Sequence, residues 1–322
     1  MPTADDPPGL SLPGFRTFFE RACPGAVAGP LRGWLIVGGK SNLTYEVTDG
    51  VTSWIVRRPP LGHVLATAHD MTREHTVMAA LADTDVPVPA MLALCTDPDV
   101  IGAPFYVMAK FAGTPYRTAA QLIPLGARRT RRISTRMVDV LVALHAIDPD
   151  SVGLNAFGRP TGFLARQVRR WKTQLDGSRG RPLTGADELY ERLRADLPAE
   201  SAPAIVHGDY RLDNLLVDET DTITAVLDWE MATLGDPLTD LALLVVYRRL
   251  ADMDTAGAVA DAARTPGFLS EREILDRYAE RSGRDFSDIG FHLGLAYFKL
   301  ATILEGIHFR HTQGQTVGEG FA

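Results

Sequence analysis

The sequence is short of cysteine, of positive charge and of long apolar runs, and each shortage excludes a class of protein. Only Cys23 and Cys95 occur in its 322 residues, and they provide neither a disulfide framework nor metal-ligand spacing. The 33 Lys and Arg are outnumbered by 40 Asp and Glu, and the net charge of -7 argues against a general nucleic-acid partner. No apolar run reaches the roughly 18 residues that span a bilayer, so no membrane partner is expected.

The N-terminal segment also lacks the features of a targeting signal. "MPTADDPPGLSLPG" has no basic n-region and no long apolar h-region, so residues 1–24 are interpreted as a Pro/Gly-rich lead-in. We therefore expect a cytoplasmic protein. The overall composition, with 45% hydrophobic and 23% charged residues, is that of a globular chain long enough for two lobes.

Residues 25–112 carry the pattern of a small antiparallel sheet with one helix. Apolar β-rich runs between 31 and 60 are broken by Gly-Gly and by Asp49-Gly50, which is a strong hairpin signal. A helix is predicted next, because apolar residues recur at helical spacing from Met71 to Leu81. Two further strands surround an Asp-Pro-Asp turn. The pattern predicts an N-terminal lobe with a sheet that carries a helix.

Residues 113–322 are predicted to be mostly helical. Helical patterns occupy 237–250, 271–282 and 288–310, whereas 204–230 alternates short apolar runs with polar turns. Five arginines between Arg128 and Arg136 begin another amphipathic helix. We interpret them as a solvated helix face or helix start rather than a nucleic-acid site, because no aromatic residue lies among them.

The segment "VHGDYRLDNLLV" (206–217) crowds hydrogen-bonding residues between apolar flanks. Its Asp209 and Asn214 project from a turn, and Asp228 ends the next short strand, "AVLDWE". This order and spacing is the one used for phosphoryl transfer, in which one carboxylate accepts the proton of the attacking hydroxyl. The amide oxygen and the second carboxylate hold Mg²⁺. Any one of these residues alone would be an ordinary turn residue, but all three together favour the chemical role.

"HGDYRLDN" followed by "VLDWEMATLGDPLTDLA" resembles the aminoglycoside phosphotransferase and choline kinase family of the protein-kinase-like superfamily. The similarity is greatest to the subgroup found fused to acyl-CoA dehydrogenases. The resemblance covers about residues 25–310 and implies an α+β, bilobal protein-kinase-like fold with ATP in the cleft between the lobes. It implies that Asp209 is the catalytic base, that Asn214 and Asp228 are the Mg²⁺ ligands, and that a buried His207 supports the catalytic loop.

Three residues of the second stretch are interpreted as structural. Asp240 is expected to brace the catalytic loop by accepting backbone N–H bonds, and Asp236 to cap a helix start. Trp229 is expected to pack rather than to bind a ligand. Gly208 stands where protein kinases have an arginine that pairs with an activation-loop phosphate, so we predict that this chain has no such switch.

The same resemblance implies a nucleotide site in the first lobe. "VGGKSN" lies where the family has its phosphate-covering loop, so Gly39, Ser41 and Asn42 are assigned to the phosphates. "WIVRRPP" contains no lysine, and Arg57 falls at the position of the phosphate-binding lysine of protein kinases, with Glu74 as its partner.

Two strands provide the remaining residues of the predicted nucleotide site: the strand that contains Arg57 and the strand that leads into the hinge between the lobes. Alternation along a strand puts Arg57 and Arg58 on opposite faces, so we expect Arg57 to face inward and Arg58 to be solvated. By resemblance, Met108 borders the adenine, although core packing explains it equally well. The backbone C=O of Ala109 and N–H of Phe111 are expected to hydrogen-bond to the edge of the adenine.

The acceptor is the least constrained part of the prediction. A polycationic aminoglycoside requires an acidic wall, but the last helix carries mostly cationic or titratable bases, namely His292, Lys299, His308, Arg310 and His311, with Glu305 as its one acid. We expect a small-molecule acceptor. The favoured function, implied by the fused relatives, is an ATP- and Mg²⁺-dependent kinase of a hydroxyacyl-CoA or hydroxy acid. An aminoglycoside or amino-alcohol kinase and a nucleotide-binding pseudokinase are alternatives, whereas an acyl-CoA dehydrogenase is disfavoured.

Overall fold

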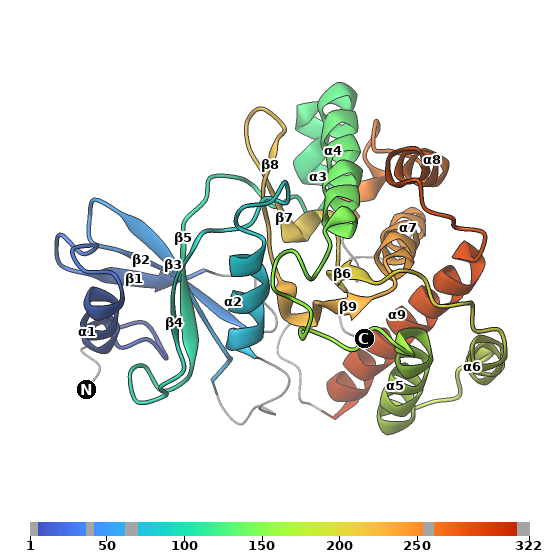
Figure 1. Cartoon of the computed structure of the whole chain (residues 1–322), viewed down its shortest axis with the longest axis horizontal. Helices are drawn as coiled ribbons and strands as arrows, with labels where there is room; N and C mark the ends of the chain where they lie inside the picture. The colour runs from blue at the N-terminus through green and yellow to red at the C-terminus, as the bar shows by residue number, and fades with distance from the viewer. Residues whose placement is uncertain (1–5, 37–41, 62–69, 254–260, 314–322) are drawn as a thin grey trace. The chain divides into compact units, whose positions relative to one another are not determined.

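The computed structural model describes residues 6–36, 42–61, 70–253 and 261–313. The chain divides into two units: the first is Met1–Gly113 with Thr224–Glu230, and the second is Thr114–Ile223 with Met231–Ala322. An antiparallel five-stranded sheet in the first unit and a mostly helical second unit confirm the predicted α+β class (Figure 1). The domain boundaries at 1–24, 25–112 and 113–322 stay a prediction. Within the described ranges, no helix is long and apolar enough to cross a membrane.

The sheet of the first unit has the strand order β1-β2-β3-β5-β4, with every neighbouring pair antiparallel. The predicted hairpin joins β2 to β3, where Asp49 Oδ1 accepts the N–H groups of Val51 and Thr52 and Gly50 has a left-handed φ of 91°. The strands are β1 (Arg32–Leu35), β2 (Leu43–Thr48), β3 (Ser53–Arg58), β4 (Met91–Cys95) and β5 (Phe105–Ala109).

Strand alternation gives this sheet two faces with different partners. One face, which includes Val56, packs against α1 (Leu12–Ala22), whose Phe15 and Phe19 are fully buried. The other face packs against α2 (Met71–Ala80), and Figure 1 shows the two helices on opposite sides of the sheet. The segment predicted as a lead-in therefore contains a helix that belongs to the core of the first unit.

Arg58 corrects one expectation from the sequence. Arg57 faces α2, as predicted, and Arg58 lies on the opposite face of β3. Arg58 is nevertheless only 5% exposed, because its Nη1 donates to the backbone oxygens of Gly9 and Ile101. The prediction that Arg58 is solvated is wrong, since the segment before α1 covers this end of the strand and supplies carbonyl acceptors that replace water.

The second unit is organised around two long helices, α7 and α9. α7 and α5 both pack against α9, and α4 packs against α8. Two short antiparallel strands, β6 and β9, pair Ala204 with Gly235 and Val206 with Thr233. The elements of this unit are α3 (Ala119–Leu122), α4 (Ala127–Ala146), α5 (Phe163–Ser178), α6 (Ala186–Ala195), β6 (Ala204–Val206), β7 (Leu215–Val217), β9 (Thr233–Gly235), α7 (Leu238–Asp252), α8 (Glu271–Ser282) and α9 (Ile289–Thr312).

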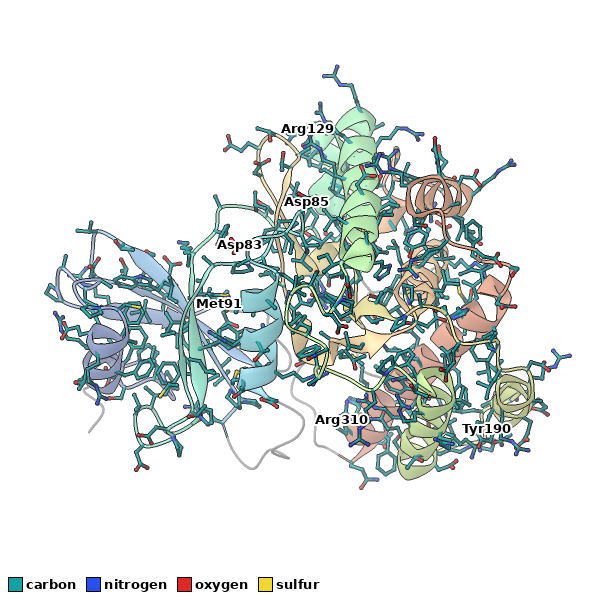
Figure 2. The ribbon with its side chains drawn as sticks, in the orientation of Figure 1. Asp83, Asp85, Met91, Arg129, Tyr190 and Arg310 are labelled. Carbon is teal, nitrogen blue, oxygen red and sulfur yellow. The ribbon has the colours of Figure 1, made fainter. Side chains whose placement is uncertain are left out.

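The arginines at the start of α4 have a more specific role than a solvated face. Arg129 (labelled in Figure 2) has its Nε 2.7 Å from Asp221 Oδ1. Arg132 also pairs with this carboxylate, which is fully buried. Arg136 donates to the backbone oxygen of Thr220 at 2.9 Å. Asp221 adopts a left-handed φ of 66°, which an ordinary residue avoids. The arginines therefore hold the turn after β7 against α4.

Candidate active site

The predicted catalytic loop, "HGDYRLDN" (207–214), follows β6 directly, and one glycine determines the path of its backbone. His207 is fully buried, and its Nδ1 accepts the N–H of Asp209 at 3.2 Å, so it supports the loop as predicted. Gly208 has a φ of 85°, and a Cβ there would lie 2.8 Å from the backbone oxygen of Met231. No larger residue fits this position without moving the neighbouring backbone, which gives a physical reason for the glycine.

Asp240 braces this loop from the first turn of α7. Its Oδ2 accepts the N–H of His207 at 2.7 Å and its Oδ1 accepts the N–H of Gly208 at 2.8 Å, which confirms the prediction. His145 on α4 lies 3.3 Å from the same carboxylate. Burial by itself raises the pKa of Asp240, but the bonds from His145 and the loop more than offset it and lower the pKa overall. Asp236 caps the start of α7 through Leu238 N–H at 2.9 Å, also as predicted.

Asp209, the predicted base, is held by two neutral donors. The Tyr247 hydroxyl on α7 donates to Asp209 Oδ1 at 2.8 Å. Asn214 Nδ2 donates to Asp209 Oδ2 at 3.2 Å and to its backbone oxygen at 2.9 Å. Arg211 stacks on the Tyr247 ring, with 4.9 Å from Cζ to the ring centroid, and pairs with Asp213. The carboxylate is therefore fixed in direction from two sides while it keeps acceptor capacity on both oxygens.

Two contacts of this loop are not predicted from the sequence. The pattern indicates only a helix for the segment that contains Tyr247, and it makes Lys299 one cation among several. The Lys299 ammonium, on α9, donates to the backbone oxygen of Gly208. A single lysine within the apolar run "LGLAYFKLATIL" is the signal that could have drawn attention to it. Glu305, by contrast, is buried away from the loop, where it accepts Gly180 N–H at 3.0 Å.

In the first unit, the predicted phosphate-binding arginine lies between two carboxylates. Arg57 Nε is 3.1 Å from Glu74 Oε2, and Arg57 Nη2 is 2.6 Å from Asp228 Oδ1. The pairing of Arg57 with Glu74 on α2 agrees with the prediction, and the pairing with Asp228 was not foreseen. Burial opposes the charge of Arg57, but nearby acidic groups including Glu74 and Asp228 raise its pKa overall.

Glu74 is the most buried member of this cluster. It is fully buried, and it also accepts the Tyr106 hydroxyl at 3.0 Å and Asn42 Nδ2 at 3.0 Å. Desolvation raises the pKa of Glu74, although Arg57 acts in the opposite direction. Asn42, predicted to contact the phosphates, therefore also ties its segment to α2. The other two residues predicted in that loop, Gly39 and Ser41, lie outside the described residues.

The residues predicted to hold Mg²⁺ have suitable ligand chemistry. Asn214 uses its Nδ2 toward Asp209, which leaves its side-chain oxygen as a hard ligand. Asp228 has a second carboxylate oxygen besides the one paired with Arg57, and its left-handed φ of 66° is a strained conformation of the kind found at functional sites. No group of three or more His, Cys, Asp or Glu is assembled for a metal within the described ranges. Each residue thus offers an oxygen of the kind that Mg²⁺ takes from a protein when its other ligands are phosphate and water.

The predicted hinge residues lie at the end of β5 and just beyond it. Met108 is 7% exposed and pairs with Ile55 in the sheet register, so packing accounts for its side chain. The N–H of Ala109 donates to the backbone oxygen of Ala90 at 2.9 Å, and its C=O was the group assigned to adenine. Phe111 lies just beyond the end of β5 and is half-buried. Trp229 is fully buried and donates to Val226 O at 2.9 Å, consistent with packing.

Sequence comparison assigns this set of residues to a family. Residues 35–278 match the family model described as the phosphotransferase enzyme family. The chain belongs to this family. The matched region contains the catalytic loop, Asp228 and the Arg57–Glu74 pair, so the family assignment rests on the parts of the chain described above. The recognition made from the sequence is confirmed.

Longer curated proteins contain a relative of this phosphotransferase-family chain. Acyl-CoA dehydrogenase family member 11 of Gallus gallus is 33% identical over 315 residues, which cover 96% of this chain but 39% of that protein. Acyl-CoA dehydrogenase family member 10 of Mus musculus is 34% identical over 281 residues, which cover 86% of this chain and 26% of that protein. The chain spans well under half the length of these relatives.

Solved structures confirm the protein-kinase-like fold. A candidate aminoglycoside phosphotransferase from Ralstonia eutropha superposes with a TM-score of 0.83 at 32% identity, covering 96% of this chain and 92% of that one. A macrolide 2'-phosphotransferase from Brachybacterium faecium gives 0.57 at 20% identity, with 93% of each chain covered, and supports the fold alone. The chain therefore has the protein-kinase-like fold of its family, and the acceptor is a separate question.

Proposed function

We propose that the chain is an ATP- and Mg²⁺-dependent kinase of a small alcohol, with a hydroxyacyl-CoA or hydroxy acid as the acceptor class. The observation that carries this proposal is the setting of Asp209. Its carboxylate is oriented by Tyr247 and Asn214, and the loop behind it is anchored by Asp240. A pre-oriented carboxylate of this kind suits a general base, whereas a module that only binds nucleotide has no need of one.

The proposed reaction is an in-line transfer of the γ-phosphoryl group. The acceptor oxygen forms a bond to the γ-phosphorus while the bond from that phosphorus to the β–γ bridging oxygen breaks. Asp209 takes the hydroxyl proton, which later passes to water, and ADP is the leaving group. Positioning and charge stabilisation provide most of the rate enhancement in reactions of this type.

The remaining site residues receive roles on the nucleotide. Arg57 is proposed to bind the α- and β-phosphates, because its guanidinium offers two parallel donors, and Glu74 to orient it. Asn214 and Asp228 are proposed to hold Mg²⁺, which would neutralise phosphate charge when bound. Gly39, Ser41 and Asn42 are proposed to cover the phosphates. The backbone of Ala109 and Phe111 is proposed to contact the adenine.

The acceptor class is supported by charge and by the relatives. The last helix places a cation, Lys299, on the catalytic loop, and its one acid, Glu305, is engaged with Gly180 and Arg181. A polycationic acceptor would therefore meet like charge beside Asp209. The relatives carry the name acyl-CoA dehydrogenase family member, and an acyl-CoA is a thioester, which favours a hydroxyacyl-CoA as the acceptor.

The test is ATP consumption with Mg²⁺ by the wild type and by Asp209→Ala. The acceptor panel contains hydroxyacyl-CoAs, hydroxy acids, amino-alcohols and aminoglycosides. We expect turnover that depends on a hydroxyacyl-CoA or hydroxy acid and that falls by about 10²-fold or more in Asp209→Ala. Asp176→Asn is the control, because Asp176 is a half-exposed carboxylate on α5 that pairs with Lys172 on the same helix.

Two outcomes would overturn the proposal in different ways. Nucleotide binding without turnover on any acceptor, unchanged by Asp209→Ala, would identify a pseudokinase. Turnover confined to aminoglycosides or amino-alcohols would keep the kinase and reject the acceptor class.

A further inference from the structure

Lys299 is a half-buried cation that lies beside the predicted catalytic loop. Its ammonium donates to the backbone oxygen of Gly208, and this carbonyl belongs to the peptide bond that leads into Asp209. The ammonium also lies 5.4 Å from the ring centroid of Trp171 on α5. Among the described side chains, no carboxylate forms an ion pair with it. Desolvation lowers the pKa of Lys299, although the charges of Asp209 and Asp240 act in the opposite direction.

An arrangement of this kind is costly unless it serves a ligand. An ammonium group that is partly withdrawn from water loses hydration unless a partner compensates it, and a carbonyl oxygen and an indole face compensate only in part. Lys172 offers a contrast in the same unit. It also lies 5.4 Å from an aromatic ring, that of Tyr190 on α6 (labelled in Figure 2), but it pairs with Asp176 at 2.6 Å.

The residue type adds to this argument. Lysine occurs at only four positions (40, 110, 172 and 299), although Lys and Arg together total 33. Arginine binds through a wide planar fork, whereas lysine is a compact point charge with three rotatable donors. One donor of Lys299 is given to Gly208 O and the ring of Trp171 occupies another side, which leaves a donor for a ligand oxygen.

We propose that Lys299 is a specificity residue that binds a carboxyl-derived oxygen of the acceptor, either a free carboxylate or the carbonyl of a thioester. This inference rests on the proposed function, because it assumes that the acceptor hydroxyl is held at Asp209. A molecule held there brings the atoms beside its hydroxyl within reach of the ammonium at Gly208 O. Arg170 strengthens the preference for an anionic group, since its Cζ lies 5.4 Å from the same Trp171 ring.

The competing explanation is that Lys299 only braces the loop. Lys299→Gln separates the two roles, because the glutamine amide still donates a hydrogen bond but carries no charge. Lys299→Met removes both, and Lys172→Met is the matched control, since it removes a lysine from an aromatic ring elsewhere in the unit. Thermal unfolding of each variant shows whether it is folded. If Lys299→Met does not fold, the test is made with Lys299→Gln alone.

The probes are 3-hydroxybutanoate, its CoA thioester and butan-2-ol, which has the same carbon chain and hydroxyl without the carboxyl oxygens. We expect both Lys299 variants to lose about 10- to 100-fold in kcat/KM for the acid or the thioester relative to butan-2-ol. A larger loss on the acid identifies the carboxylate as the partner, and a larger loss on the thioester identifies the carbonyl. Lys172→Met should leave the ratios unchanged.

An equal loss on all three probes, or no loss, would overturn the proposal and leave Lys299 as a brace. Calorimetric titration with the acid and the thioester keeps this test separate from that of the proposed function. If the wild type transfers no phosphate, the kinase proposal fails, but weaker binding of either probe by Lys299→Gln still supports the acceptor site. Equal binding by wild type and Lys299→Gln, or no binding by either, overturns it.

Discussion

The two units hold their functional carboxylates in opposite ways. In the first unit, Glu74 and Asp228 are both paired with the guanidinium of Arg57. In the second unit, Asp209 accepts hydrogen bonds from the neutral side chains of Tyr247 and Asn214. In the first cluster, the positive charge of Arg57 offsets the negative charges of Glu74 and Asp228, and this arrangement suits a site that anchors phosphates. The donors that orient Asp209 are neutral, which suits a group that must take and release a proton.

Removing the positive charge of Arg57 should produce the largest effect on stability, because no charge then offsets the two carboxylates of the first cluster. Arg57→Met leaves Glu74, which is fully buried, and Asp228 without their shared partner. We expect the free energy of unfolding to fall by about 3–5 kcal/mol, measured by urea denaturation. The double variant Arg57→Met/Glu74→Met should recover part of that loss, since it removes the stranded charge together with its partner. A single variant as stable as the wild type would show that the cluster is not held by charge.

The second unit should depend instead on one buried acceptor of backbone hydrogen bonds. Asp240→Ala strands the N–H groups of His207 and Gly208, and we expect a loss of about 2–4 kcal/mol in the free energy of unfolding. Asp218→Ala is the matched control, because Asp218 accepts two backbone N–H groups, of Thr220 and Thr222, at an exposed turn where water replaces it. Similar losses in the two variants would contradict a special role for the buried brace.

Tyr247→Phe tests whether neutral donors orient the base. We expect kcat to fall about tenfold, equivalent to about 1.4 kcal/mol, because one of the two bonds that direct the carboxylate is lost. The affinity for nucleotide should not change. Tyr297→Phe provides the control, since its hydroxyl contacts Arg249 rather than Asp209. An unchanged kcat would mean that Asn214 alone is sufficient to orient Asp209.

The smallest effect concerns two carboxylates, one in each unit, whose pKa values are both lowered to about 2. Asp49 in the first unit owes its shift to backbone N–H groups, chiefly that of Thr52, whereas Glu273 in the second owes its shift first to Arg131. Each carboxylate stabilises the folded state above the ordinary pKa near 4 and loses that contribution as pH falls toward about 2.

Salt should separate these two causes. In an NMR titration of the side-chain carboxyl carbons, about 1 M salt should raise the pKa of Glu273 by screening Arg131, and should change that of Asp49 less. Equal shifts of the two pKa values would refute the assignment of causes. Arg131→Met should reproduce the effect of salt on Glu273 at low ionic strength.

Much of the site could be predicted because its parts lie close together along the chain. Asp209 and Asn214 are five residues apart and hydrogen-bond to each other, so their spacing carries the geometry. The hairpin at Asp49-Gly50 is equally local, since the aspartate bonds its own turn. The roles of Asp236 and Asp240 followed from their places at the start of a helix, where unsatisfied N–H groups need acceptors.

The contacts that were missed or misjudged join residues far apart in the sequence. Tyr247 reaches Asp209 across 38 positions, and Lys299 reaches Gly208 across 91. No local pattern distinguishes these side chains from ordinary helix residues, because their neighbours are supplied by other helices. Arg58 was judged solvated for the same reason, since its acceptors come from Gly9 and Ile101.

The amino-acid order thus determined the elements and the family of this protein, together with the acid, amide and arginine that its chemistry uses. Periodicity, turn residues and motif spacing express local preferences of the backbone, which act before any packing. Folding decided which neighbours those groups receive: a phenol and a lone ammonium at the catalytic loop, and a second carboxylate at Arg57. Such neighbours depend on how distant segments pack, and packing is a property of the whole chain.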